Sequence, residues 1–173
     1  MVTRYSNIKK NSEVMDVLYY IILGRNTVKE LKEVLKQPQS TISTKLRFLR
    51  QNKIISKNKW NFEPNWDEIY KIMYAELRKL LDFKTKKRSV KPEKYVNKKI
   101  LKGILKVYSL LFSRDYGKYS IRDMLDSFLD TLSRAKDNDL KKMDKNLLVL
   151  KKVLGKLPSE EELLLEYLQK NVK

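Results

Sequence analysis

Residues that interrupt helices are scarce in this chain. Its 173 residues include only four glycines and four prolines, and both residue types are unfavourable inside an α-helix. Between them, apolar residues recur at spacings of three and four, which is the period of one helix face. The sequence therefore predicts a mainly α-helical protein in which each glycine or proline marks a boundary.

Three short helices are predicted before residue 53. The first begins near Ser12, and the second begins at Thr27, which forms a capping-box pattern with Glu30. Pro38 separates the second helix from a third over about 40–52. The residues expected on the inward faces are Val14, Val17, Leu18, Ile21, Ile22, Val28, Leu31, Val34, Leu35, Ile42, Leu46 and Leu49.

A short β-hairpin is expected next. Segments 54–57 and 60–62 contain Ile, Trp and Phe, and the pair Asn58-Lys59 between them predicts the turn. Three helices followed by a two-stranded hairpin, with only four residues joining the second and third helices, is the element order of a winged helix-turn-helix.

The segment VKELKEVLKQPQSTISTKLRFLRQNKIIS resembles the helix-turn-helix core of ArsR-type and MarR-type regulators. Four features are shared. They are an E-L pair (Glu30-Leu31), a polar start of the third helix (residues 39–43), an L-x-x-L pair (Leu46/Leu49) and an apolar pair before the hairpin (Ile54-Ile55). Two features differ: Lys53 stands where the family usually has Gly, and the hairpin is short. The resemblance covers about residues 12–65 and implies a DNA-binding domain.

Uncharged hydrogen-bonding side chains gather at the start of the third helix. Hydroxyl and amide groups can pair with base edges, and basic groups farther along can bind phosphates. The candidate DNA-binding residues are Gln39, Ser40, Thr41, Ser43, Thr44, Lys45, Arg47 and Arg50 on the helix, and Lys57, Asn58 and Lys59 on the hairpin. We also expect Ser40 or Thr41 to cap the helix; the alternative interpretation is that these two residues do only this, which leaves the other polar groups unexplained.

Positive charge is concentrated in the first two-thirds of the chain. The formal net charge is +18, of which residues 1–66 carry +8, residues 67–119 carry +9 and residues 120–173 carry +1. Such a basic surface favours a nucleic-acid partner; the alternative is a solvated surface in a lysine-rich chain. The stretch 84–102 has nine basic residues and one acid, and is either a phosphate-binding surface or a solvated linker.

Several classes of function have no residues to support them. The chain has no cysteine and no histidine, which excludes disulfides, Cys/His zinc sites and histidine-based catalysis. No phosphate-binding loop or nucleophile motif occurs, so we expect neither a cofactor nor an enzymatic activity. Asp123, Asp126 and Asp130 share a helix face, where ion pairs with arginines are favoured over a metal site.

No apolar segment is typical of a signal peptide or a membrane span, which predicts a cytoplasmic protein without a membrane partner.

The rest of the chain is predicted to be helical. Helices are expected over 66–83, 93–113, 120–135, 139–154 and 160–172, with a basic linker over 84–91. The run LLLEYL in the last helix is apolar around most of its circumference and must be covered on more than one side. We therefore expect a DNA-binding domain (1–65), a long helix with the linker (66–91), and a C-terminal helical domain (92–173) that forms a homodimer. The alternative is that these helices pack within one chain.

These features predict a sequence-specific transcriptional regulator that binds double-stranded DNA. The third helix would enter the major groove, and hairpin residues 57–59 would contact the DNA backbone. Three alternatives remain: DNA binding without sequence preference in chromatin, replication or plasmid partition; a protein–protein adaptor; and RNA binding.

Overall fold

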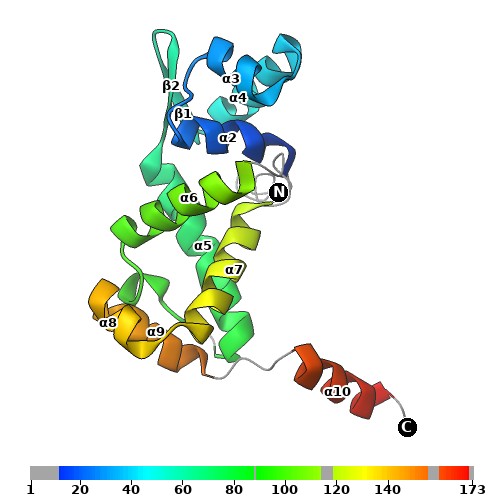
Figure 1. Ribbon diagram of the computed structural model, residues 1–173, viewed down its shortest axis with the longest axis vertical. Helices are drawn as coiled ribbons and strands as arrows, with labels where there is room; N and C mark the ends of the chain where they lie inside the picture. Colours follow the sequence, from blue (N-terminus) through cyan, green and yellow to red (C-terminus); the bar gives the residue numbers. More distant parts are fainter. Residues whose placement is uncertain (1–11, 88, 114–118, 156–159, 172–173) are drawn as a thin grey trace.

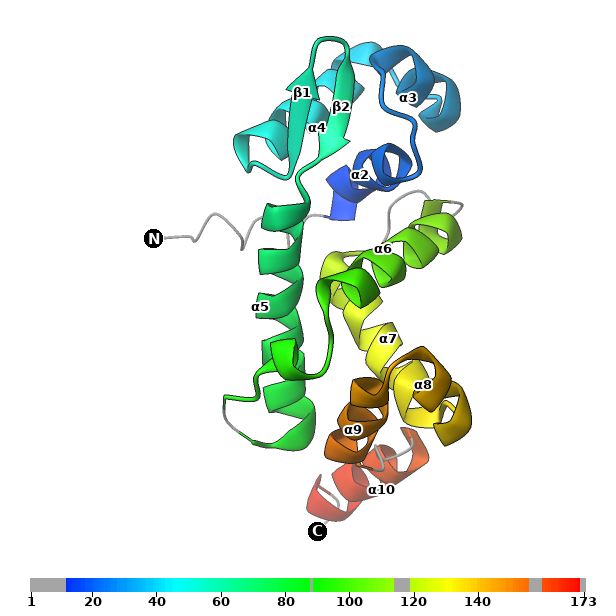
Figure 2. The same cartoon turned by 90° about the vertical axis from the view of Figure 1, so that its left-hand side faces the viewer.

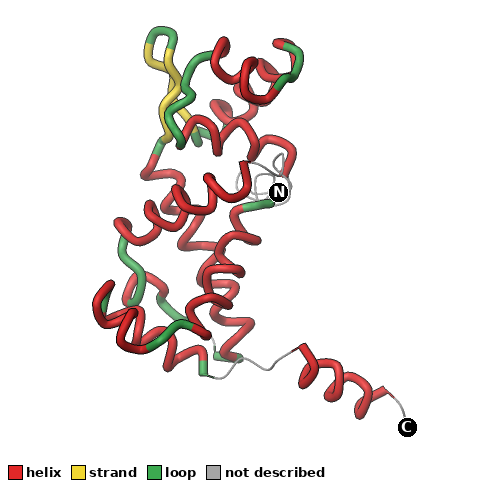
Figure 3. Tube along the Cα trace, viewed as in Figure 1, coloured by secondary structure: helices red, strands yellow, loops and turns green. Residues whose placement is uncertain are grey.

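The computed structural model of the protein describes residues 12–87, 89–113, 119–155 and 160–171. Over these residues the protein is mainly helical, and its strands form one two-stranded antiparallel sheet (Figure 1; Figure 3). The elements are η1 (Ser12–Val14), α2 (Met15–Ile22), α3 (Val28–Leu35), α4 (Gln39–Gln51), β1 (Ile55–Asn58), β2 (Asn61–Pro64), α5 (Trp66–Thr85), η2 (Pro92–Lys94), α6 (Lys98–Phe112), α7 (Ile121–Arg134), α8 (Asp137–Met143), α9 (Lys145–Leu154) and α10 (Glu160–Asn171). The predicted order of three helices, a hairpin and further helices is confirmed.

Helix α2 is buried on nearly every side. It begins later than predicted, because residues 12–14 form a turn of 3₁₀ helix (η1) and Met15 is the first α-helical residue. Seven of its eight residues are buried, and one of them is the carboxylate-bearing Asp16. Helix α2 contacts α3, α4, β2 and α6. It is therefore the element around which the neighbouring helices and the hairpin pack.

Helix α3 begins at the predicted cap. The Glu30 N–H donates to Thr27 Oγ1 at 3.2 Å, and the Thr27 N–H donates to the Glu30 carboxylate at 3.1 Å. These bonds complete the capping box, and the hydroxyl and backbone of Thr27 lower the pKa of Glu30. The helix ends at Lys36, which takes a left-handed conformation with φ 51°. That residue turns the chain toward α4.

Helix α4 begins one residue earlier than predicted. Pro38 occupies the N-cap position, and no side chain caps this helix. Ser40 and Thr41 therefore lie within the first turn, so the expectation that one of them caps the helix is wrong. The inward face is as predicted, with Ile42, Leu46 and Leu49 buried.

The hairpin turn lies one residue later than predicted. Asn58 pairs with Asn61, so the two turn residues are Lys59 and Trp60 rather than Asn58 and Lys59. This register places Ile55 and Phe62 on the buried face. A one-residue shift would place these two side chains on opposite faces, which excludes that register. The predicted turn at residues 58–59 would pair Ile55 directly with Phe62 on one face, so their burial alone does not distinguish it from the observed register. Lys59 supplies the left-handed conformation of the turn, with φ 53°.

Two predicted C-terminal helices differ from the structure. The segment predicted as one helix from residue 93 is a 3₁₀ turn, η2, followed by α6, whose N-cap Asn97 accepts from the Ile100 N–H. The segment predicted as one helix over 139–154 is two helices that meet at Asp144, which caps α9. In both places a short polar side chain binds a backbone N–H and starts a new helix. The predicted cap at Ser159 lies outside the described residues.

Helices α6, α7 and α9 pack against α5. This 20-residue helix runs from the hairpin along the length of the molecule, with α7 beside it (Figure 2). Helices α5, α7 and α9 contact one another, and one cluster of buried residues extends from α2 to α9. Within the described part of the chain, every helix is too short or too polar to span a bilayer.

We predict that Thr27→Ala lowers the free energy of unfolding by about 1 kcal/mol, because it removes the acceptor that caps α3. Urea denaturation measures the change. The folded-state pKa of Glu30 is lowered, so the capping-box contribution is present above the unfolded-state pKa and is lost as pH falls through the folded-state value. The cost of the substitution should therefore decrease in acid. Thr41→Ala is the matched control, since exposed Thr41 caps nothing, and an equal cost there would contradict the cap assignment.

Candidate nucleic-acid interface

One face of α4 carries most of the predicted DNA-binding residues. The exposed residues of the predicted set on this helix are Gln39, Ser40, Thr41, Ser43, Thr44, Arg47 and Arg50. They lie opposite the buried side chains at positions 42, 46 and 49. The helix contains no acidic residue. Its outer face therefore combines neutral hydrogen-bonding groups near the start with two guanidinium groups near the end.

The hydroxyls of this face remain accessible. Thr44 Oγ1 donates to the Ser40 carbonyl at 2.9 Å, one turn back along α4. This bond uses the single proton of the Thr44 hydroxyl, while its oxygen still has lone pairs that accept. Thr44 can thus accept a hydrogen bond from a ligand, whereas the Ser40 hydroxyl can rotate to donate or accept.

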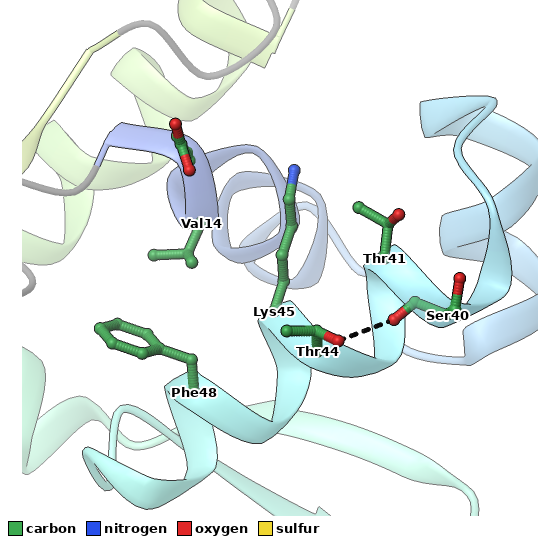
Figure 4. Close-up of a pocket in the computed structure, with 7 residues that line it drawn as sticks. Val14, Ser40, Thr41, Thr44, Lys45 and Phe48 are labelled. Atoms are coloured by element: carbon green, nitrogen blue, oxygen red, sulfur yellow. Dashed lines mark hydrogen bonds between the residues drawn. The ribbon is translucent and has the colours of Figure 1, made fainter.

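A hollow of about 410 Å³ lies along the same face (Figure 4). Its lining residues come from η1 and α4, and they are Glu13, Val14, Ser40, Thr41, Thr44, Lys45 and Phe48. The hydroxyls of Ser40, Thr41 and Thr44 line one part, and the apolar side chains of Val14 and Phe48 lie in another. The start of α4 therefore offers a ligand both hydrogen-bonding groups and an apolar contact.

Lys45 lies in a buried polar cluster rather than at the exposed face. Its Nζ is 2.7 Å from Asp16 Oδ2 and 3.0 Å from Gln37 Oε1, and Gln37 Nε2 donates to Asp16 Oδ2 at 3.0 Å. The Asp16 side chain is 4% exposed and the Lys45 side chain 15%. The ammonium group that we expected to face DNA is directed toward α2 instead.

This cluster holds three elements together. Asp16 belongs to α2, Gln37 to the turn between α3 and α4, and Lys45 to α4. A buried carboxylate needs several donors, and Asp16 also accepts from the Val17 N–H at 2.7 Å. The cluster and the buried side chains of Ile42, Leu46 and Leu49 together hold α4 in one rotation against α2, in which the side chains on the opposite side of α4 face outward.

The hairpin presents basic side chains at the same end of the molecule as α3 and α4 (Figure 1). Lys57, Asn58 and Lys59 are exposed, as predicted for contacts with a phosphate backbone. Lys57 Nζ lies 5.8 Å from the centre of the Phe62 ring, which is within cation–π range. Trp60, the other turn residue, is 82% exposed.

Part of the basic stretch 84–102 is bound within the protein. Lys84 pairs with Asp126 at 2.7 Å. Lys102 lies 4.8 Å from the Trp66 ring centre, and Lys98 lies 5.7 Å from that of Tyr70. Lys98 is nevertheless exposed, as are the remaining described lysines of the stretch, at positions 86, 87, 91, 94 and 99. Arg88 lies outside the described residues.

The two aromatic rings beneath these lysines belong to α5. Trp66 and Tyr70 stack with ring centres 5.7 Å apart. Burial, with the nearby charge of Asp67, raises the pKa of Tyr70. The stack is part of the joint between α5 and α6, so we assign its two cations a packing role.

The aspartates at positions 123, 126 and 130 have partners within the protein. Asp123 accepts from the Ser120 N–H at 2.8 Å, Asp126 pairs with Lys84, and Asp130 pairs with Arg134 at 3.2 Å. Asp123 completes a capping box at the start of α7, which the sequence analysis did not identify. Among the residues that the structure describes, no group of three potential ligands is arranged to hold a metal ion.

Asp16, Gln37 and Trp60 were not among the predicted site residues. Asp16 is an acid within the apolar pattern of the first helix, which is a signal for a buried charge that needs a partner. Its partners are 21 and 29 residues away, so spacing alone does not identify them. Trp60 was assigned to a strand, and the register places it in the turn.

Comparison of the chain with known protein families, with curated protein sequences and with solved structures finds no match. None of these comparisons therefore assigns the chain to a family.

We predict that Asp16→Ala lowers the free energy of unfolding by about 3–5 kcal/mol, because it leaves the ammonium of Lys45 buried without its carboxylate. Urea denaturation followed by circular dichroism measures this. Asp126→Ala is the matched control: its pair with Lys84 has the same 2.7 Å distance, but its carboxylate is 54% exposed. That substitution should cost about 1 kcal/mol or less. Equal costs would show that burial does not determine the strength of the Asp16 pair.

Proposed function

We propose that residues 12–65 form a winged helix-turn-helix and that the protein is a transcriptional regulator that binds double-stranded DNA in the cytoplasm. The outer face of α4 is the observation that carries this proposal. It presents seven of the predicted contacts and no acid, and the basic hairpin turn lies at the same end of the molecule. A polyanion with hydrogen-bonding edges complements such a surface.

The dimensions of α4 suit the major groove of DNA. An α-helix with its side chains is about 10–12 Å wide, and the groove is about 12 Å wide. Gln39, Ser43 and Thr44 then face base edges from the first turns of α4. Arg47 and Arg50 reach phosphates, as do the hairpin lysines at positions 57 and 59. Asp16 acts as a positioning residue, because it orients α4 through Lys45 and Gln37.

The start of α4 also favours a phosphate. The first N–H groups of a helix lack acceptors within the helix and carry partial positive charge. In α4 these groups belong to Gln39 and Ser40, next to exposed hydroxyls. A DNA phosphate there would fix the register of the helix along the groove.

The C-terminal helices support a homodimer in this proposal. Helix α10 stands apart from the other helices in Figure 1 and exposes Leu164, Leu165, Tyr167 and Leu168. Apolar side chains gathered in this way mark an interaction surface. We assign a second copy of the chain to this surface, since a dimer of winged helices reads two half-sites and gains specificity.

We predict that binding to duplex DNA weakens steeply with salt, with a log–log slope of about −0.9 for each phosphate neutralised. Selection of bound sequences from a random duplex library, followed by titration of a selected site at several salt concentrations, tests this. Gln39→Ala should reduce discrimination at one base pair by about 1–3 kcal/mol. Lys59→Ala is the contrasting variant and should weaken selected and random duplexes about equally.

Three results would argue against sequence-specific binding to DNA. Recovery of no preferred sequence would indicate DNA binding without sequence choice. Stronger binding to RNA than to duplex DNA would indicate an RNA-binding protein. An affinity that barely changes with salt would show that the basic surface does not bind phosphates.

We predict that Leu165→Glu weakens self-association by about tenfold or more, as loss of a buried apolar contact does at an interface. Sedimentation equilibrium measures it. Met143→Glu on α8 is the matched control, because Met143 is also an exposed apolar residue but lies outside α10. Wild-type protein that stays monomeric at every concentration would contradict the dimer.

A further inference from the structure

The hairpin turn exposes the side chain of Trp60. At 82% exposure, it is the most exposed of the large apolar side chains that the structure describes. A tryptophan in this position leaves most of a large apolar surface in contact with water. Removing this surface from water by covering it with a partner would be favourable, so Trp60 is a candidate contact residue.

The hairpin holds Trp60 in a defined position. Asn58 pairs with Asn61, which leaves only Lys59 and Trp60 in the turn. The Phe62 N–H donates to the Asn26 carbonyl at 2.8 Å and joins the hairpin to the loop before α3. At the other end, the Asn65 N–H donates to the Ile54 carbonyl at 2.8 Å. These bonds fix the backbone of the hairpin, so the loop that carries Trp60 loses little conformational entropy when it binds.

The charges around Trp60 favour a polyanion. Residues 57–62 read KNKWNF, with two lysines and no acid. The hairpin's one acid, Glu63, pairs with Ser56 farther from the turn. Two cations beside a flat aromatic face match a phosphate backbone and the π-face of a base. Lysines alone suffice for phosphates, so the indole indicates a contact with the bases themselves.

We propose that Trp60 inserts between base pairs from the minor groove of duplex DNA, where it partly unstacks one step and bends the helix. This inference rests on the proposed function, because α4 in the major groove brings the hairpin to the adjacent DNA. The minor groove, about 6 Å wide, is too narrow for an α-helix but admits a tight turn. Apolar side chains that enter it act as wedges and kink the duplex toward the major groove.

The wedge adds sequence preference without a hydrogen bond to a base. Pyrimidine–purine steps such as TA and CA unstack most easily. The selected sites therefore contain such a step at a fixed distance from the bases that α4 contacts. Lys57 and Lys59 contact the phosphates on either side of the opened step.

Trp60→Ala tests the wedge through the salt dependence of binding. It should weaken duplex binding by about tenfold, as loss of one stacking contact does, and leave the salt slope unchanged because no charge is lost. Lys59→Ala should instead reduce the slope by about 0.9. Phe83→Ala is the matched control: Phe83 is 78% exposed on α5, and its loss should change neither quantity.

Fluorescence and bending provide direct readouts. The chain has two tryptophans, so Trp66→Phe makes Trp60 the only indole, and stacking on bases should quench its emission when a selected duplex is added. Energy transfer between dyes at the duplex ends should report a bend with wild-type protein and a straighter duplex with Trp60→Ala.

Different failures lead to different conclusions. If wild-type protein binds no duplex, both the proposed function and the wedge are wrong. If it binds duplex with unquenched Trp60 and unchanged Trp60→Ala affinity, only the wedge is wrong. Stronger quenching of Trp60 emission by single-stranded DNA than by duplex DNA would also overturn the wedge. So would similar quenching by polyglutamate or by raising the protein concentration alone, because each result assigns Trp60 to another partner.

Discussion

The buried ion pair between Asp16 and Lys45 determines how the N-terminal elements fit together. Removing two charges from water is unfavourable unless donors and acceptors surround them, and here Gln37 bonds to both groups. Such a cluster has few geometries that satisfy every member. It therefore selects one rotation of α4 against α2, in which the three apolar residues of α4 face inward and its hydroxyls face solvent. The polar nature of the outer face of α4 thus depends in part on the Asp16–Lys45 pair on its inner side.

The basic side chains of the protein have different roles. Some lysines are held by carboxylates, as Lys84 is by Asp126, and others lie over aromatic rings, as Lys102 does over Trp66. These side chains help join helices, so counting basic residues along a stretch overstates the charge available to a partner. Around α4 and the hairpin turn, the described basic side chains other than Lys45 lie exposed. Our proposals therefore depend on this end of the molecule rather than on the total charge.

The features predicted correctly from the sequence are local or periodic. The cap at Thr27 and the inward face of α4 follow from spacings within one helix. The features that were missed depend on contacts between separate segments: the hairpin register depends on the pairing of β1 with β2, and the Asp16 cluster joins residues up to 29 positions apart. The N-cap role of Asp144 was missed because an N-cap residue and a residue inside a helix differ by one backbone hydrogen bond. The spacing of apolar residues does not reveal that difference. For the candidate site, the predicted residues of α4 other than Lys45 are exposed, but the sequence did not reveal the cluster of Asp16, Gln37 and Lys45.

The hairpin is joined directly to α5, so the orientation of this helix affects the position of the hairpin. Only Asn65 separates β2 from Trp66, and its side chain donates to the Lys53 carbonyl at 2.9 Å while its backbone bonds to Ile54. These two hydrogen bonds tie the hairpin base to the start of the helix. A helix of 20 residues is about 30 Å long, so a tilt of about 5° at its far end displaces the near end by about 3 Å. A change in packing around α7 and α9 that tilted α5 by this amount would therefore displace the hairpin by about the length of a hydrogen bond.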